Sequence, residues 1–271
     1  MNSKRQLSHN IIYFLRVYFM IVKKSLNKSM AFQFEFASKI VRMILIVLLQ
    51  IILIRSLYSG TSNIQGWSIE EYYLLLGTFN FVNYLGWGIF NINLWRLEEK
   101  ILKGEFDFLL LLPTGSIFSA SMTEFFLDDA IGSLSGVILI IYYIVVSSGS
   151  LTFPMVVMYL AAVMIAFVLW FSIHLTFAAV NFIAVKNGLM DLVKNLSRIG
   201  SFPIDIFSQS IRLLLYSIFP IAFIAAVPSR LLSGVISYEY LLLGVAVSIV
   251  SLFLTRRFWH FCIRSYTSSG G

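Results

Sequence analysis

Charge, cysteine and histidine are all scarce in this chain of 271 residues. Only 12% of the residues are charged, where a soluble domain carries roughly 25%, and 59% are hydrophobic. The single cysteine, Cys262, excludes an internal disulfide, and three scattered histidines offer no metal-ligand spacing. We therefore expect no metal site and no cofactor bound by this chain. The composition predicts an all-α, polytopic membrane protein with no sizeable soluble domain.

Apolar stretches with few or no Asp, Glu, Lys or Arg residues predict six transmembrane helices within one domain, residues 1–271. A bilayer span needs about 20 mostly apolar residues, because charges at the bilayer centre are costly. The longest uncharged stretch, Ala130 to Val185, is divided by the turn-like sequence SSGSLTFP and is typical of a helical hairpin. The expected spans are residues 40–57, 72–95, 130–147, 154–181, 206–227 and 238–255.

Basic residues are distributed unequally between the two sides of these spans. The 20 Lys and Arg exceed the 13 Asp and Glu, but a polytopic membrane protein gathers basic residues on its cytoplasmic side, so nucleic-acid binding is not indicated. With a cytoplasmic N-terminus, 17 basic residues lie inside, including Lys194 and Arg198 after the fourth span. Arg55 and Arg230 lie outside, and Arg212 lies within the fifth span. Both termini, including the tail 256–271, are therefore expected in the cytoplasm, with the protein in the inner cell membrane.

The N-terminal segment, residues 1–39, precedes the first span. From Ser8 to Met30 apolar residues alternate irregularly with Arg and Lys, which predicts an amphipathic helix in the anionic inner interface. A basic, loosely ordered anchor is the alternative. The segment has no small-residue cleavage site, so we expect no removable signal peptide.

The connection after the second span, residues 96–115, combines charges of both signs with large apolar residues. Helical spacing from Leu94 to Lys103 predicts a short amphipathic helix, and Gly104 suits its C-terminal cap. A helix made for anionic lipid would not carry several acids, so the mixed charge favours a protein partner over lipid, with a solvated loop as the alternative. The candidate contact residues are Arg96, Leu97, Glu98, Glu99, Lys100, Lys103, Gly104, Glu105 and Asp107.

Three motifs together resemble one family of membrane proteins. KGEFDFLLLLP (Lys103–Pro113) is similar to the motif after the second span in membrane subunits of type-2 ATP-binding-cassette (ABC-2) exporters. PIDIFSQSIRLLLYSIFPIAFIAAVPSRLLSG (Pro203–Gly234) resembles the family's fifth span, and RRFWHFCIRSYTSSGG resembles its C-terminal end. The order of the motifs fits the whole chain. Phe106 departs from the family, which has a smaller aliphatic residue there.

The resemblance implies a permease that dimerises with an identical or related chain and rests on separate ABC ATPase subunits. The G-x-x-x-x-G-K-[ST] pattern that cradles nucleotide phosphates does not occur here, so ATP and Mg are expected on the partner and this chain is not expected to be an enzyme. By the same resemblance, Arg96 to Lys103 is the coupling helix, and short re-entrant helices lie between the last two spans. The alternatives are an ion-gradient-driven transporter or channel and a membrane-bound scaffold or enzyme subunit. No motif indicates the substrate.

Three acids precede the third span: Glu124, Asp128 and Asp129. Glu124 and Asp128 are four residues apart, which would place them on one helix face. One hypothesis makes the acids a cation or proton site in the translocation path. The other places them at the inner interface, where they favour the positive end of the helix dipole.

Three further residues are polar or helix-breaking within predicted spans. Arg212 has Asp205 as its nearest acid in the sequence, and it can snorkel to the inner interface, pair with an acid from a neighbouring span or meet an anionic head group. Pro220 removes a helical hydrogen bond and indicates a kink or a broken helix. His174 is expected to form an interhelical hydrogen bond, because no motif supplies a catalytic partner.

Overall fold

The computed structural model describes residues 2–30, 33–147, 149–185 and 187–267, and it is helical throughout. Among these residues there is no strand, only an isolated bridge between Ile64 and Trp67. The expected all-α fold is confirmed. The α-helices are α1 (Asn2–Met30), α2 (Gln33–Leu57), α3 (Ile69–Gly86), α4 (Ile92–Trp95), α5 (Leu97–Leu102), α6 (Phe106–Leu110), α7 (Ser116–Ser121), α8 (Leu127–Val146), α9 (Phe153–Ala179), α10 (Leu189–Ser197), α11 (Gln209–Tyr216), α12 (Ala226–Leu232) and α13 (Glu239–Ile263).

Five short turns of other helix types join these elements. A π-helical turn, η1 (Trp87–Asn91), connects α3 to α4, so that residues 69–95 form one nearly continuous rod. The remaining four are 3₁₀ turns. They are η2 (Val180–Phe182), η3 (Arg198–Ser201), η4 (Ile204–Ile206) and η5 (Ile221–Phe223).

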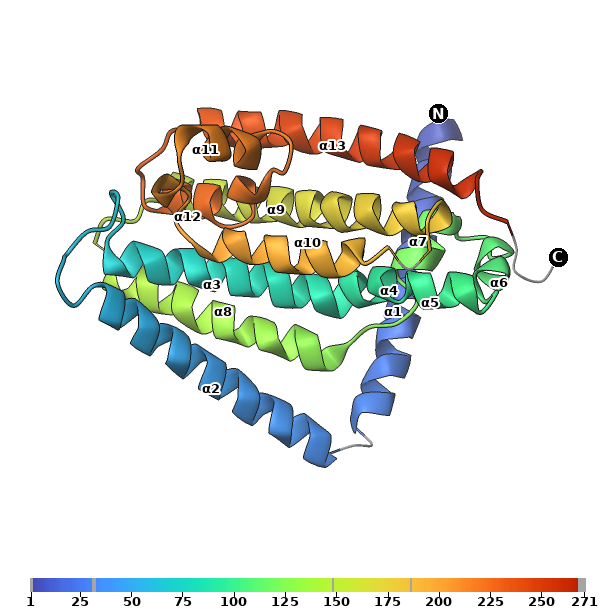
Figure 1. Cartoon of the computed structure of the whole chain (residues 1–271), viewed down its shortest axis with the longest axis horizontal. Helices are drawn as coiled ribbons and strands as arrows, with labels where there is room; N and C mark the ends of the chain where they lie inside the picture. Colours follow the sequence, from blue (N-terminus) through green and yellow to red (C-terminus); the bar gives the residue numbers. More distant parts are fainter. Residues whose placement is uncertain (1, 31–32, 148, 186, 268–271) are drawn as a thin grey trace.

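The long helices lie side by side in one bundle. Figure 1 shows α3, α8, α9, α10 and α13 running along a common direction, with α2 diverging from the others towards its N-terminus. One end of the bundle, here named the α5 end, carries α5, α6 and the C-terminal tail. The opposite end, named the α12 end, carries the loop of residues 58–68 together with α11 and α12.

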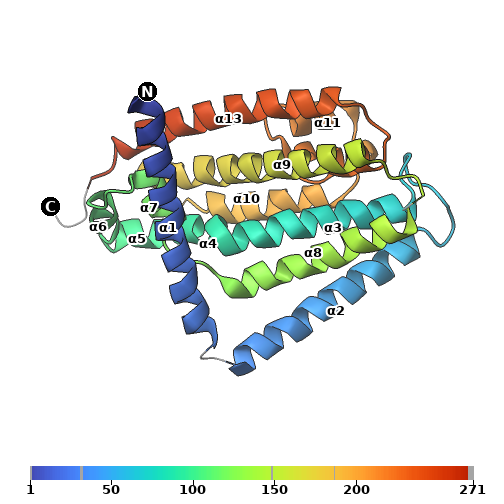
Figure 2. The same ribbon diagram turned by 180° about the vertical axis from the view of Figure 1, so that it is seen from behind.

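Helix α1 crosses the bundle at the α5 end instead of running along it (Figures 1 and 2). The ring of Phe14 packs on Phe118 of α7 at 5.1 Å, and the backbone N–H of Phe125 donates to the Ser25 hydroxyl at 3.1 Å. The predicted N-terminal helix is therefore present in the structure, and its placement in the membrane interface stays a prediction.

Four helices are long and apolar enough to cross a membrane, considering the described residues. They begin at Ala37, Leu127, Phe153 and Glu239. Predicted span 72–95 is helical, but α3 begins with two acids and contains Asn80 and Asn83, which make it less apolar. Predicted span 206–227 is not one helix, so the expected count of six spanning helices is not reproduced.

The fifth crossing of the bundle is made by residues before the predicted span. Lys194 lies over the Trp87 ring, Gly200 packs against Phe79, and Asp205 accepts a hydrogen bond from the Trp67 indole. Trp87, Phe79 and Trp67 follow one another in reverse sequence order along α3 and the residues that flank it. The chain between residues 194 and 205 therefore runs antiparallel to α3, towards the α12 end. The prediction missed this crossing because it contains two basic residues, which were assigned to a connection outside the membrane.

The closest helix pair is α3 with α8, and it depends on glycine. A Cβ on Gly77 would lie 2.9 Å from the backbone oxygen of Gly136, and one on Gly136 would lie 2.5 Å from the backbone nitrogen of Phe81. Gly132, one turn earlier, likewise lies against the Tyr84 ring. Small residues let the two backbones approach closely. The resulting van der Waals packing stabilises the pair, because the hydrophobic effect does not drive helices together in lipid.

Candidate functional site

Helix α5 lies within the predicted helix of residues 94–103, which the structure divides at Arg96 between α4 and α5. Leu97 and Ile101 are buried, whereas Glu99, Leu102 and Lys103 are exposed. The helix ends where expected, because Gly104 has a φ of +70°, a conformation that glycine adopts without strain. An apolar face is thus fixed against the bundle while a charged face points away from it.

Glu99 on the exposed face of α5 pairs with Lys103, which directly follows the helix. Lys103 donates from Nζ to Oε1 of Glu99, one turn before it, and this hydrogen bond lowers the pKa of Glu99 and raises the pKa of Lys103. Glu98 is half-buried beside them. The side chains of Lys103 and Glu99 are 57% and 61% exposed, so the pair is free to exchange partners with an approaching protein.

Phe106 anchors the next turn through an aromatic cluster. Its buried ring packs on Phe182 at 4.9 Å and on Tyr266 at 5.4 Å, and Phe182 also meets Trp259 of α13 at 5.0 Å. The Tyr266 hydroxyl donates to Asp107 at 2.9 Å, and burial raises the pKa of Tyr266. The aromatic residue that departs from the family pattern therefore joins α6 to the ends of α9 and α13.

Apolar side chains next to α5 are unusually exposed. Phe108 and Leu111 expose 72% and 81% of their surface. Leu102, Leu110 and Leu112 are exposed as well, and Glu105 lies exposed at the start of α6. Contiguous apolar surface of this kind, rimmed by charge, is typical of an interaction site.

The segment before α8 is fastened to α4 and α5. The buried Asn93 side chain donates to the backbone oxygen of Glu124 at 2.8 Å and accepts from the Thr123 hydroxyl at 2.8 Å and from the Glu124 N–H at 3.1 Å. Lys100 donates to Thr123 at 2.9 Å, and burial lowers the pKa of Lys100. Arg96 pairs with the Glu124 carboxylate at 3.4 Å, and both of these side chains are about half exposed.

The three acids before the third span do not meet at one site. Helix α8 begins only at Leu127, so Glu124 lies before it and does not share a helix face with Asp128. Asp128 pairs with Lys39 of α2, whereas Asp129 lines a cavity. No group of three potential metal ligands occurs among the described residues. The structure gives the three acids separate surroundings, and a role of these acids in the translocation path stays a prediction.

A polar cavity of about 450 Å³ lies between α2, α3, the start of α8 and the segment 194–202. Asn80 closes one side by donating to Gln50 of α2 at 3.0 Å. The other lining residues are Phe79, Asn83, Tyr84, Trp87, Asp129, Lys194, Ser197, Arg198, Ser201 and Phe202.

His174 lies fully buried on α9, but it does not bridge to another helix. Its Nδ1 lies 2.9 Å from the carbonyl oxygen of Trp170 in the same helix, and its Nε2 has no hydrogen-bond partner within the described parts of the chain. The ring packs edge-on against Trp87 at 6.2 Å. The expected interhelical hydrogen bond is thus replaced by aromatic packing.

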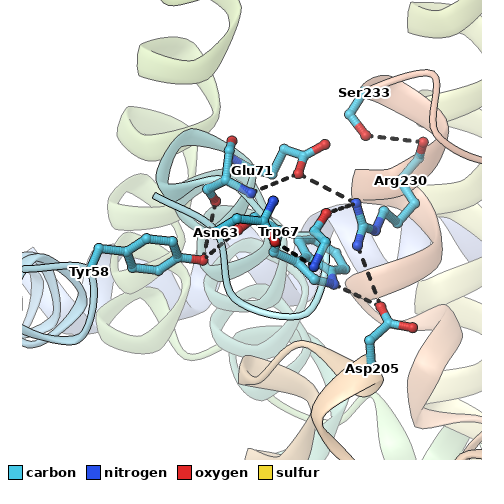
Figure 3. Close-up of polar contacts among 9 residues, drawn as sticks. Tyr58, Asn63, Trp67, Glu71, Asp205, Arg230 and Ser233 are labelled. Atoms are coloured by element: carbon cyan, nitrogen blue, oxygen red, sulfur yellow. Dashed lines mark hydrogen bonds and ion pairs between the residues drawn. The ribbon is translucent and has the colours of Figure 1, made fainter. Parts of the chain in front are cut away.

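A buried ion network at the α12 end was not predicted (Figure 3). The Arg230 guanidinium, 10% exposed, donates to the carbonyl oxygen of Gly66 at 2.8 Å and faces Glu71 at 3.4 Å and Asp205 at 3.5 Å. It also lies over the Trp67 ring, 3.8 Å from the centroid, and the Trp67 indole donates to Asp205 at 2.7 Å. One cation thereby joins the start of α3 to α12 and to η4.

The turn before α3 places Trp67 in this network. Gln65 and Gly66 have φ angles of +51° and +81°, the signs of a tight two-residue turn that favours glycine. The Tyr58 hydroxyl donates to the carbonyl oxygen of Trp67 at 2.9 Å, and burial raises the pKa of Tyr58 to about 12, which keeps this donor neutral. Ser68 then caps α3 through a reciprocal pair of hydrogen bonds with Glu71. The Ser-x-x-Glu spacing and the Gln-Gly pair were the available sequence signals.

Arg212 lies at the α12 end, where it pairs with Asp205. The distance between Nη1 and Oδ1 is 3.5 Å, and the Arg212 side chain is 41% exposed. Among the described residues, Arg212 thus pairs with the acid seven residues before it, and not with an acid from a neighbouring span. Helix α11 ends at Tyr216 and Pro220 precedes η5, so the chain is broken near this proline, as the missing N–H requires.

Comparison with known proteins agrees with the helical architecture. Residues 41–270 match the family described as ABC-2 family transporter protein, a stretch that contains three of the long apolar helices and all but the first four residues of the one that begins at Ala37. No curated protein and no solved structure matches the chain. With most of its length matched, and with its apolar membrane-crossing helices, this chain belongs to the ABC-2 family of membrane permeases of ABC transporters.

Proposed function

We propose that this permease is an exporter subunit that forms half of a transmembrane dimer and receives movement from separate ATPase subunits through α5. The observation that carries the proposal is the arrangement of α5, whose Leu97 and Ile101 are buried while its charged face is exposed beside an apolar patch. Such a helix suits docking of another protein, because buried apolar anchors hold it while its polar face stays accessible.

The contacts of α5 explain how a movement imposed on this helix would be transmitted to the long helices. Lys100 and Asn93 tie the α4–α5 corner to the segment before α8, and Phe106 ties the following turn to α9 and α13. Closure of the ATPases on ATP would therefore move three long helices together and open a path between protomers. The path would work by alternating access or by lateral release.

The distribution of charge supports a cytoplasmic α5 end. Moving Lys194 and Arg198 from the inner side into the bundle reduces the inner count from 17 to 15, and Arg212 at the α12 end raises the outer count from two to three. The basic bias remains strong. Cysteines at Ser3 and Ser269 should then resist impermeant thiol reagents in intact cells, whereas one at Asn63 should react.

The experiment that tests coupling reverses two charges, Glu98→Lys with Glu99→Lys. The added positive charges should repel a docking surface that accepts these acids, so the purified complex is expected to lose its ATPase chain or to hydrolyse ATP without moving substrate. Glu239→Lys, the reversal of an exposed acid at the α12 end, is the control and should leave both properties unchanged. Normal ATPase association and transport in the double variant would contradict docking through the charges of α5.

An ion-gradient-driven transporter is less well supported by the same structure. Coupling to an ion gradient needs ionisable groups gathered in the membrane-embedded region. Glu124, Asp128 and Asp129 point to three different partners or surfaces. The ABC exporter is therefore the function that the arrangement favours.

A further inference from the structure

We propose that the polar cavity between α2, α3 and the segment 194–202 binds the phosphate head group of a bilayer amphiphile, with Lys194 and Arg198 as its cationic contacts. The inference rests on the proposed function only for the placement of the bundle in the membrane. It names a ligand class and a site that coupling through α5 does not require.

The geometry of the cavity places two cations on one wall. Lys194 and Arg198 are separated by one helical turn and both line the cavity. Ser197 and Ser201 line the same wall, but their hydroxyls donate to the carbonyl oxygens of Val193 and Arg198. The donors available to a ligand are therefore the Lys194 ammonium and the forked Arg198 guanidinium, which suit a phosphate with its several acceptor oxygens.

The two cations are not neutralised by the protein itself. Within the described parts of the chain, neither Lys194 nor Arg198 forms an ion pair, and Lys194 lies only over the Trp87 ring, 5.3 Å from its centroid. Like charges one turn apart repel each other. An anion bound between them would remove this repulsion.

The one acid in the cavity has basic neighbours of its own. Asp129 feels the charges of Lys39 and Arg42, both on α2, in addition to that of Lys194. Lys39 pairs with Asp128, the residue before Asp129, so this part of α2 lies against the start of α8. Because α2 already supplies positive charge to Asp129, the cations of the 194–202 wall remain available to a ligand.

The position of Lys194 and Arg198 along the bundle makes it energetically unfavourable to leave the cavity without a polar ligand. The segment runs along α3 from the level of Trp87 to that of Phe79, and the side chains of Lys194 and Arg198 are exposed. Charged side chains at membrane depth face water, a partner charge or a polar ligand, because contact with lipid tails is unfavourable.

The surroundings favour a membrane-anchored phosphate over a free one. A cavity of about 450 Å³ admits a head group and not a whole lipid. Gln50 of α2 forms part of the lining, and the neighbouring α2 residues Leu45, Leu48 and Leu49 are exposed and apolar. A head group could therefore occupy the cavity while its acyl chains stay beside α2 in the bilayer.

The test measures ligand binding by calorimetry on the detergent-solubilised complex of permease and ATPase. The probes are dihexanoyl phosphatidylglycerol below its micellar concentration, octyl glucoside as a neutral amphiphile, and inorganic phosphate. We expect the phospholipid to bind, and Lys194→Gln with Arg198→Gln to weaken its binding at least tenfold. Asp129→Asn should tighten it, because a negative charge is removed from the cavity.

The matched control is Arg256→Gln with Arg257→Gln, which removes two exposed charges of α13 outside the cavity. This variant should bind the phospholipid like the unmodified complex, and all variants should elute and melt like it. Unchanged binding in the cavity double variant, or weaker binding in Asp129→Asn, would overturn the site. Equal binding of inorganic phosphate would overturn the assignment to a membrane amphiphile. None of these outcomes touches α5, so the coupling proposal stands or falls separately.

Discussion

The two ends of the bundle use charge in opposite ways. At the α12 end, Arg230 is 10% exposed and faces two carboxylates, an indole ring and a backbone carbonyl oxygen. At the α5 end, the ion pairs of Arg96 with Glu124 and of Lys103 with Glu99 lie in solvent. The charged residues of the α12 end stabilise the fold, whereas those of the α5 end remain accessible to a partner.

This difference indicates that the charges of the α12 end serve stability and those of the α5 end serve function. Removing one partner from a buried network leaves uncompensated charge, while an exposed pair contributes little and can be exchanged. The α12 end should therefore tolerate few substitutions without loss of stability. The α5 end should tolerate many, and their effects should appear in coupling instead.

The largest effect is expected from Arg230→Leu. Glu71 and Asp205 would face each other without their shared cation, which should destabilise the fold by about 3–5 kcal/mol. Denaturant or thermal unfolding in detergent measures the loss. Arg212→Leu, which removes the half-exposed second partner of Asp205, is the control and should cost far less. Equal losses in the two variants would mean that burial does not distinguish them.

A smaller effect is expected from Trp67→Phe. The phenyl ring keeps a surface beneath Arg230, but Asp205 loses the indole N–H that lies 2.7 Å away. Hydrogen bonds to charged groups are worth about 1.5–3 kcal/mol, so the same unfolding measurement should show a loss in this range. Trp95→Phe, whose indole bonds the exposed Asp191 at 3.2 Å, is the matched change at the α5 end and should cost less.

Asn93→Ala tests whether the buried Asn93 side chain holds the segment before α8 in place at the α5 end. The substitution leaves the N–H and carbonyl oxygen of Glu124 and the hydroxyl of Thr123 without their buried partner. We expect a loss of about 1–3 kcal/mol. Hydrogen exchange should rise first in residues 122–126. Unchanged protection there would mean that the amide does not fix this segment.

Part of the architecture could be predicted because its signal is local. The helical spacing of residues 94–103 and the glycine after them identify α5. The uncharged stretch 130–185 identifies α8 and α9, and the weaker apolar runs 40–57 and 238–255 identify α2 and α13. Composition alone excluded disulfides, because that conclusion needs no geometry. The family resemblance was confirmed for the same reason, since its motifs are continuous in the sequence.

The rest depends on contacts between distant residues. Glu71, Asp205 and Arg230 meet only after the chain has folded, and each looks like a loop or interface charge in the sequence. The crossing by residues 194–205 was missed for a related reason. Its two basic residues face a polar cavity inside the bundle, so the rule that charges mark the ends of spans does not apply to them.

The smallest effect is expected for the exposed pair of Arg96 and Glu124. Their 3.4 Å contact is weakened by solvent, so Arg96→Ala and Glu124→Ala should each change stability by about 0–1 kcal/mol. A double-mutant cycle isolates the pair, since Arg96 also lies 4.8 Å from the centroid of the Phe126 ring and the single variant removes both contacts. An interaction energy near that of a buried pair would remove the contrast between the two ends. A negligible interaction energy together with altered ATPase coupling in Arg96→Ala would sharpen the contrast, because the charge would then serve the partner and not the fold.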